Sequence, residues 1–229
     1  MGKLTIMRIT VGILEQQGKT AAVWPPGGNL ISRWSFDDDN GDDTSGNAYT
    51  LTDASGTSTY SAGKVNNALD LDGSTYMHNE SYYDGFTNEM TMAFWYKCNS
   101  QTHDGAIIVD AQLLPEYYIY LQANDKFYLS FTRDLTALET VDAIVDDTWH
   151  FVVAIYDNGD YYLYQDNVLE DSLSNTPDTF SAATAISVGS YTGDVAAYAF
   201  EGSLDNIYIY DIAIDSSTRD SLWNNGNGI

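Results

Sequence analysis

The chain has little cysteine, little positive charge and no long apolar run. Cys98 is the one cysteine among 229 residues, which excludes a disulfide within the chain and a thiolate zinc site, since such a site takes several cysteines. Lysine and arginine number 9 against 33 aspartate and glutamate, and the formal net charge is −24. This balance argues against nucleic acid and anionic lipid as partners, because both require a basic face. No run reaches about 18 apolar residues, so no membrane insertion is expected.

Apolar side chains and aspartate are what the sequence has in quantity. Hydrophobic residues make up 44% and aromatic residues 14%, which is enough for a sizeable core and argues against a disordered chain. The acid consists of 26 Asp and only 7 Glu. Aspartate favours turns, metal loops and a solvated surface, whereas glutamate favours helices. The composition predicts a β-protein with an acidic surface.

Short apolar runs separated by turn residues fill the chain from residue 30 onward. Asp157-Asn158-Gly159-Asp160 lies between two aromatic runs and predicts a hairpin with a type I′ turn, since Asn and Gly both accept positive φ. Only 215–223 has helical character, with Asp215 or Ser216 as its N-cap. Short strands with almost no helix predict an all-β fold, an antiparallel two-sheet jelly-roll sandwich. The expected strands are 30–36, 68–71, 90–97, 106–111, 117–122, 126–132, 149–156, 161–165, 185–188 and 200–210.

Residues 1–29 differ from the rest and are expected to form an extended N-terminal arm before a single domain at 30–229. The joint Pro25-Pro26-Gly27-Gly28 marks the boundary, because proline cannot enter a ladder and glycine bends freely. Arg8 and Glu15 interrupt the apolar stretch, so it does not read as a secretory signal peptide. Such an arm suits strand addition to other protein subunits or a contact in a homo-oligomer, and the alternative is an extra strand on its own sandwich. The expected assembly contacts are Leu4, Ile6, Met7, Ile9, Val11, Ile13 and Leu14.

Seven motifs follow one another in a recognisable order. They are ISRWSFD at 31–37, DTSGN at 43–47, GKVNNALDLDG at 63–73, MAFWYK at 92–97, TWHFVV at 148–153, YLYQDN at 162–167 and EGSLDNIYIY at 201–210. This series resembles the laminin-G-like jelly-roll domains of the concanavalin A-like lectin/glucanase superfamily over roughly 31–225. The resemblance implies the concanavalin A-like sandwich, and the arm has no counterpart in it. One departure is Gln165-Asp166-Asn167, where the family usually has an aspartate-glycine turn.

The sequence offers no catalytic pattern. A glucanase of this superfamily would carry Glu-x-Asp-x-x-Glu or a close variant on one strand, because alternate residues share a face and two carboxyl groups must flank the sugar bond. None of the seven glutamates begins such a pattern. His78, His103 and His150 lie far apart in the sequence, and no Gly-x-Ser-x-Gly elbow is present. We therefore expect no enzyme, with a glycan-cleaving hydrolase as the least favoured alternative.

Calcium is the one cofactor that the sequence favours. The loop 37–43, DDDNGDD, has carboxylates at its first, third and seventh positions, and carboxylate oxygens are the ligands that calcium prefers. Members of the family that this sequence resembles often hold a structural calcium near an early Asp-x-Ser-Gly loop and an aspartate of the last strand. The resemblance therefore implies Asp43 and Asp205 as calcium ligands. The alternative is that these aspartates close turns and contact only water. The expected Ca²⁺ ligands are some combination of Asp37, Asp43, Asp72 and Asp205.

Tyrosines in predicted loops are the expected sugar contacts. Aromatic rings stack on the apolar faces of sugars, so a groove with aromatic and acidic side chains suits a neutral glycan. The resemblance implies core positions for Trp34, Trp95 and Trp149, which leaves the loop tyrosines, although tyrosines in such loops can instead cover the core. The expected carbohydrate-binding residues are Tyr82, Tyr83 and Tyr191.

The expected function is display on a larger assembly. Laminin-G-like domains are usually extracellular, whereas this sequence shows no secretory signal, and a protein that folds in the cytoplasm and is released by lysis reconciles the two. We expect a non-catalytic phage-type virion surface protein, a decoration or appendage protein, that exposes a lectin-like jelly roll on the virion or extracellular surface. The alternative is a carbohydrate-binding or adhesion module.

Overall fold

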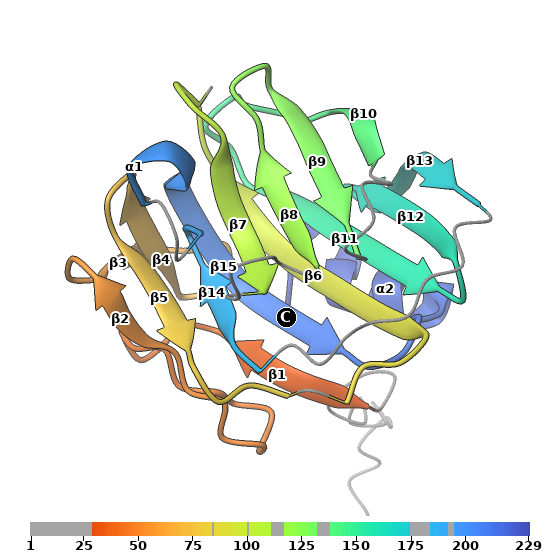
Figure 1. The fold of residues 1–229 in the computed structure, drawn as a ribbon, viewed down its shortest axis with the longest axis horizontal. Helices are drawn as coiled ribbons and strands as arrows, with labels where there is room; N and C mark the ends of the chain where they lie inside the picture. Colours follow the sequence, from red (N-terminus) through yellow and green to blue (C-terminus); the bar gives the residue numbers. More distant parts are fainter. Residues whose placement is uncertain are drawn as a thin grey trace, which may run out of the picture.

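Two antiparallel β-sheets, here called sheet A and sheet B, pack face to face (Figure 1). The computed structural model describes residues 29–83, 85–99, 101–110, 117–131, 138–174, 184–191 and 195–229. The predicted assembly contacts between Leu4 and Leu14 lie outside the described residues, so the arm and the division at residue 29 stay predictions. The expected all-β, two-sheet jelly roll is confirmed.

Sheet A holds the longest strands of the fold. Its order is β13 (Val168–Leu173), β12 (Asp160–Gln165), β11 (His150–Asp157), β6 (Glu89–Lys97), β15 (Glu201–Tyr210), β4 (Asn67–Asp72) and β3 (Thr59–Ala62). An eighth strand, β1 (Leu30–Trp34), also pairs with β15. The first half of β15 is bonded to β4 and the second half to β1, so the sheet forks beside Asp205.

Sheet B is the second layer. Its order is β10 (Leu138–Asp142), β9 (Lys126–Ser130), β8 (Tyr118–Leu121), β7 (Gly105–Asp110), β14 (Ile186–Val188), β5 (Tyr76–Asn79) and β2 (Thr52–Ser55). The short helices are α1 (Val195–Tyr198), α2 (Ser216–Trp223) and the 3-10 turn η1 (Asn224–Gly226). No helix in the described part of the chain is long and apolar enough to cross a membrane.

Alternation along the strands assigns side chains to the two faces of each sheet. In β6, Phe94 and Tyr96 point between the sheets, while Trp95 points to the outer face of sheet A. That outer face is covered by α2, whose Trp223 stacks on Trp95 at 5.3 Å between ring centroids. Asp215 begins the helix as predicted, because its Oδ1 accepts the Thr218 N–H at 2.7 Å. The sandwich therefore has one core between the sheets and a second apolar layer under α2.

Two hairpins with left-handed turns connect the strands at one edge of sheet A. Asn158 and Gly159 have φ of 50° and 102° between the paired residues Asp157 and Asp160, which confirms the predicted turn. Asp166 and Asn167 have φ of 50° and 66°, so they build an equivalent turn without glycine. The departure from the aspartate-glycine pattern thus leaves the β12–β13 hairpin intact.

Candidate functional site

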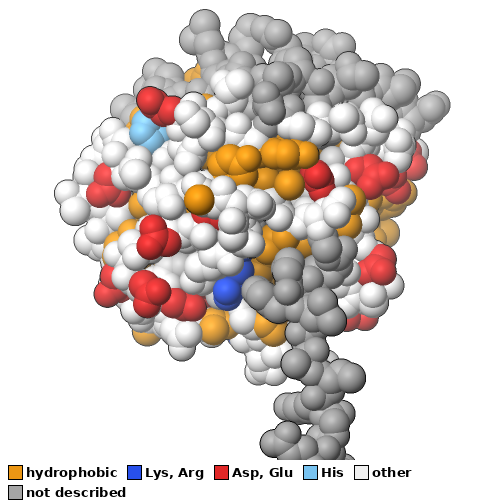
Figure 2. Space-filling view, turned by 90° about the horizontal axis from the view of Figure 1, so that it is seen from below, with side chains coloured by type: hydrophobic (Ala, Val, Ile, Leu, Met, Phe, Trp, Pro, Cys, Tyr) orange, Lys and Arg blue, Asp and Glu red, His pale blue; other side chains and the backbone are white. Residues whose placement is uncertain are grey.

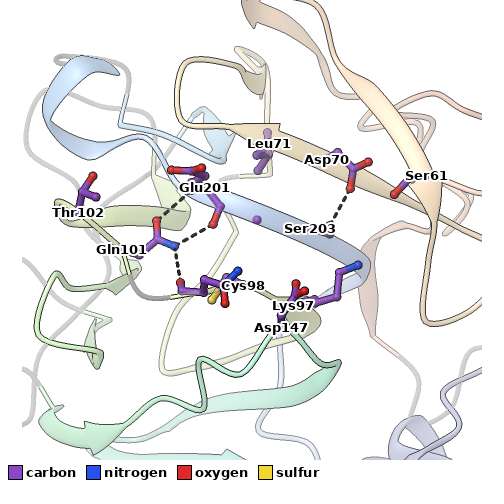
Figure 3. A pocket seen from close by; sticks show the side chains of 12 residues that line it. Ser61, Asp70, Leu71, Lys97, Cys98, Gln101, Thr102, Asp147, Glu201 and Ser203 are labelled. Carbon is purple, nitrogen blue, oxygen red and sulfur yellow. Dashed lines mark hydrogen bonds between the residues drawn. The ribbon is translucent and has the colours of Figure 1, made fainter.

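A groove of about 590 Å³ crosses the outer face of sheet A near the end of β6 (Figure 3). Asp70 on β4 and Lys97 on β6 both lie opposite Ser203 on β15 in the strand register. The three side chains share the outer face, because their respective neighbours Leu69, Tyr96 and Leu204 belong to the core between the sheets. This groove, called the sheet A groove below, is lined by Ser61, Asp70, Leu71, Lys97, Cys98, Asn99, Gln101, Thr102, Asp147, Glu201, Gly202 and Ser203.

Gln101 fixes one end of the sheet A groove. Its side chain is buried, and its Nε2 donates to the Glu201 carbonyl at 2.8 Å while its Oε1 accepts the Glu201 N–H at 3.0 Å. On the other side, the Asp147 N–H donates to the Cys98 carbonyl at 3.0 Å. The close approach also needs Gly202, because a Cβ there would lie 2.6 Å from the Lys97 carbonyl oxygen. The shape of the groove is therefore fixed by hydrogen bonds to backbone groups and by the close packing of strands at Gly202.

The polar groups of the sheet A groove are suited to hydroxyl groups. The Ser203 hydroxyl donates to Asp70 Oδ1 at 2.7 Å, so this pair presents an ordered carboxylate. Lys97 Nζ lies 5.4 Å from the centroid of the half-buried Trp149 ring. Three carboxylates and one ammonium line the groove, and Glu201 and Asp147 are exposed to solvent. Acidic side chains also prevail over basic ones on the face seen in Figure 2. Such a groove can hydrogen-bond a neutral polar ligand and repels an anionic one.

Five tyrosines form a second surface, on the outer face of sheet B. Tyr118 and Tyr120 on β8 alternate with core residues, and Tyr128 lies directly opposite Tyr120 on β9. Tyr198, at the end of α1, contacts both Tyr120 and Tyr191, with ring centroids 5.8 Å and 5.9 Å apart. These five residues are called the tyrosine surface below. Burial raises the pKa of Tyr118 and of Tyr120, so both hydroxyl groups stay protonated at neutral pH.

The three predicted sugar contacts are not brought together. Tyr82 is only 5% exposed, and its hydroxyl lies 2.6 Å from the Ser32 hydroxyl in the core, so it is not available to a ligand at the surface. Tyr83 is half-buried, and its hydroxyl donates to Asp211 Oδ2 at 3.0 Å. Tyr191 alone joins a surface cluster, the tyrosine surface.

The four predicted calcium ligands lie on three different segments: Asp37 and Asp43 on the loop after β1, Asp72 at the end of β4, and Asp205 within β15. The two oxygens of Asp43 accept four donors, namely the N–H groups of Arg33, Ser45 and Tyr49 and the Ser45 hydroxyl. Asp72 closes the turn after β4. Among the described residues, no group of three or more His, Cys, Asp and Glu side chains could hold a metal ion. The four residues together do not fit one calcium site, and calcium binding stays a prediction.

Asp37 and Asp205 are the two of the four that interact. Asp205 is fully buried where the sheet forks, and its Oδ2 accepts the Val65 N–H at 2.8 Å. Burial raises the pKa of Asp205 to about 7, the charge of Asp37 adds to the rise, and the bond from Val65 opposes it. Asp37 Oδ1 is buried and has no hydrogen-bond partner among the described residues. Of the four predicted ligands, Asp37 and Asp205 are therefore the two that could bind the same calcium ion.

His150 and Cys98 have structural surroundings. His150 Nδ1 lies 2.7 Å from Asp166 Oδ2, and Nε2 lies 3.1 Å from Asp146 Oδ1, so the ring joins the β12–β13 turn to the loop before β11. Burial raises the pKa of the Cys98 thiol to about 12, which leaves it uncharged and unreactive at neutral pH.

Sequence reasoning missed the sheet A groove, and of the tyrosine surface it identified only Tyr191. The residues of the sheet A groove come from strands far apart in the sequence, and only the strand register brings Asp70, Lys97 and Ser203 into one row. The tyrosine surface did leave a signal: Tyr118, Tyr120 and Tyr128 alternate with apolar residues inside two predicted strands, which places them on one face.

A family model and several solved structures match the chain. A laminin G family model described as Concanavalin A-like lectin/glucanases superfamily matches residues 71–218, more than half of the chain. No curated protein matches it by sequence. Domain 4 of AbnA, a GH43 extracellular arabinanase from Geobacillus stearothermophilus solved in complex with arabinotriose, superposes with a TM-score of 0.69 at 22% identity. That match covers 88% of this chain and 98% of that domain.

Two toxin domains are also similar. The binding domain of Paraclostridial Mosquitocidal Protein 1 has a TM-score of 0.70 at 17% identity, and the binding domain of botulinum neurotoxin DC in complex with SialylT has 0.69 at 12%. Each match covers 86% of this chain but 52% of the toxin domain, so the chain spans about half the length of these two. At such identities the likeness concerns the fold.

Proposed function

Because the chain belongs to a laminin G family of the concanavalin A-like lectin/glucanase superfamily, we propose that it is a non-catalytic carbohydrate-binding module that holds a neutral oligosaccharide in the sheet A groove. The observation that carries the proposal is the fixed row of Asp70, Ser203 and Lys97, which offers acceptors and a donor at defined positions on a rigid sheet. The groove volume of 590 Å³ lies within the range of about 300–1,000 Å³ usual for ligand sites. A structural neighbour that was solved with arabinotriose supports a sugar as the ligand.

The charges support a neutral sugar over an acidic one. Three carboxylates and one ammonium line the groove, and the whole chain carries −24. Sialylated or sulfated glycans would bring further negative charge into this potential. A neutral sugar is not repelled, and its hydroxyl groups can donate to Asp70 and accept from Lys97.

The groove supports binding over cleavage. A glycosidase keeps one carboxylic acid protonated by placing it among apolar groups, while a second carboxylate stays charged. Here Glu201 and Asp147 are exposed, and Asp70 is bonded to the Ser203 hydroxyl. The test is to incubate the protein with the neutral oligosaccharides it binds and to assay new reducing ends; their release would overturn the non-catalytic part of the proposal.

Calorimetric titration of the full chain with neutral oligosaccharides, arabinotriose among them, tests the ligand and the site. We expect Lys97→Met or Glu201→Ala to weaken binding about tenfold or more, on the scale of a hydrogen bond to a charged group. Glu170→Ala, on the distant strand β13, is the matched control and should bind like the unmodified protein. The proposal fails if no neutral oligosaccharide binds, or if the double variant Lys97→Met/Glu201→Ala binds as well as the control.

We further propose that the protein is displayed on a phage-type virion or another extracellular surface. The negative charge supports it, because repulsion keeps crowded copies apart, and so do the apolar residues of the segment 1–29. A glycan-binding module on such a surface would serve adhesion.

A further inference from the structure

The tyrosine surface presents overlapping rings and not a flat layer. Tyr118 and Tyr128 have centroids 5.4 Å apart with ring planes at 29°, and Tyr120 and Tyr128 are 6.5 Å apart with planes at 21°. Nearly parallel rings at these separations must be offset, since rings in full overlap would be closer. Each ring therefore leaves part of its face uncovered by its neighbour. Tyr198, which is 36% exposed, continues the row beyond Tyr120.

Consecutive centroid distances along the row Tyr128, Tyr118, Tyr120, Tyr198, Tyr191 are 5.4, 5.1, 5.8 and 5.9 Å. The row is thus longer than a single sugar ring. It spans β9, β8 and the two segments around α1, and α1 packs against β7 beside it (Figure 1). A row of aromatic faces with a hydroxyl group on every ring suits a ligand that alternates apolar faces and hydroxyl groups, as a polysaccharide does.

The charges around the row decide between classes of ligand. Asp104 raises the pKa of Tyr120 and Asp110 raises that of Tyr191, each acting in addition to burial, so both carboxylates lie near the rings. Anionic glycans and anionic lipids are therefore disfavoured here. A second copy of the chain is disfavoured as well, because each copy would bring the same charge of −24.

We infer that the tyrosine surface is a second carbohydrate-binding site, on the side of the sandwich opposite to the sheet A groove, and that it takes an extended neutral polysaccharide. The inference rests on the proposed carbohydrate-binding function and adds a second site to it. One domain then contacts two polysaccharide chains, or two distant parts of one chain, and a long polymer gains avidity that a short oligosaccharide does not.

Paired variants on the two faces test the inference. Tyr120→Ala/Tyr128→Ala removes two of the five rings, which lie directly opposite each other on β8 and β9, and Tyr162→Ala/Tyr164→Ala, two alternate tyrosines on β12 of sheet A, is the matched control. Binding of neutral polysaccharides, such as arabinan and mixed-linkage glucan, is measured by affinity electrophoresis, and binding of oligosaccharides by calorimetry. Far-ultraviolet circular dichroism and melting temperature check that each variant is folded.

We expect the Tyr120/Tyr128 variant to bind polysaccharide about threefold to tenfold more weakly for each ring removed, the scale of one aromatic contact, and to keep its oligosaccharide affinity. Tyr120→Phe, which keeps the ring, should keep most of the binding. Polysaccharide binding equal to that of the control overturns the inference, while the groove variants then still test the proposed function. Loss of polysaccharide binding in the tyrosine variant with no effect of the groove variants would support the inference and overturn the groove as the site. If no glycan binds the unmodified protein, both fall.

Discussion

Replacing Asp205 with asparagine should change how the stability of the domain depends on pH. The buried carboxyl group has a pKa of about 7 in the folded chain, above its ordinary value of 3.8. Between these two values the folded state holds a proton that the unfolded state has released. Folding therefore loses stability as pH rises from about 4, and the loss is complete once pH exceeds the folded pKa.

The size of the effect follows from the shift. A rise of about three units corresponds to about 4 kcal/mol of stability lost between pH 4 and pH 8 through this one group. Asparagine has no proton to release, so Asp205→Asn removes this slope. In the unmodified protein, Asn206 Nδ2 donates to Asp205 Oδ1 at 2.9 Å. In the variant, the asparagine amide nitrogen takes the place of Oδ1, and because it cannot accept a hydrogen bond, this bond is lost. That loss costs about 1 kcal/mol and is the same at every pH.

Urea unfolding at pH 4.5, 6 and 8, followed by tryptophan fluorescence, measures the difference in the free energy of unfolding between Asp205→Asn and the unmodified protein. The variant should be slightly less stable at pH 4.5 and clearly more stable at pH 8. Asp38→Asn, at an exposed aspartate, is the control for the change of side chain itself. A difference that stays constant from pH 4.5 to 8 would refute the assignment of a raised pKa to Asp205.

Three other perturbations have defined outcomes. Trp95→Ala removes the ring that lies between Phe151 and Trp223, at centroid distances of 5.1 and 5.3 Å. It should lower the free energy of unfolding in urea by about 3–5 kcal/mol, and a loss below about 1 kcal/mol would contradict the packing of α2 on sheet A. Millimolar calcium added after a chelator should raise the melting temperature, with about 2.7 kcal/mol of stabilisation at a hundredfold excess over Kd, and Asp37→Asn should reduce the rise; no rise in metal-free protein would remove the calcium prediction. Deletion of 1–29 should leave the melting temperature unchanged and abolish incorporation into the native assembly, and normal occupancy of the truncated protein would disprove the anchoring role.

The apolar strands could be predicted from the sequence, and the polar ones could not. Strands such as β6, β11 and β15 are buried along most of their length, so their apolar runs were sufficient evidence. β2, β3 and β13 lie at sheet edges and are largely exposed, so polar residues fill them and no alternation of apolar residues marks them. Polar edges of this kind protect a sheet from pairing with other chains, which is why the pattern that identifies a strand is missing there.

The candidate sites could be predicted less well, for a different reason. Asp205 was identified through the family pattern, but its burial depends on the turn that donates Val65 N–H from 140 positions away in the sequence. Tyr82 sits next to a glycine-containing loop and still enters the core, because Ser32 offers its hydroxyl a buried partner. Both outcomes depend on contacts across the sandwich, which local patterns do not contain.

Aspartate outnumbers glutamate in this chain because the folded loops use the shorter side chain. An aspartate can accept an N–H two or three residues further on, and glutamate, one methylene longer, closes such turns poorly. Asp72 does this after β4 and Asp215 at the start of α2, and Asp43 gathers four donors within one loop. Hydrogen bonds from Ser74 and Thr218 lower the pKa of Asp72 and Asp215 respectively, so both stay charged at neutral pH. Part of the negative charge is thus required by the fold itself. A module built in this way cannot exchange its potential for a positive one without losing its turns, which favours neutral glycans over anionic ones as ligands of the two proposed sites.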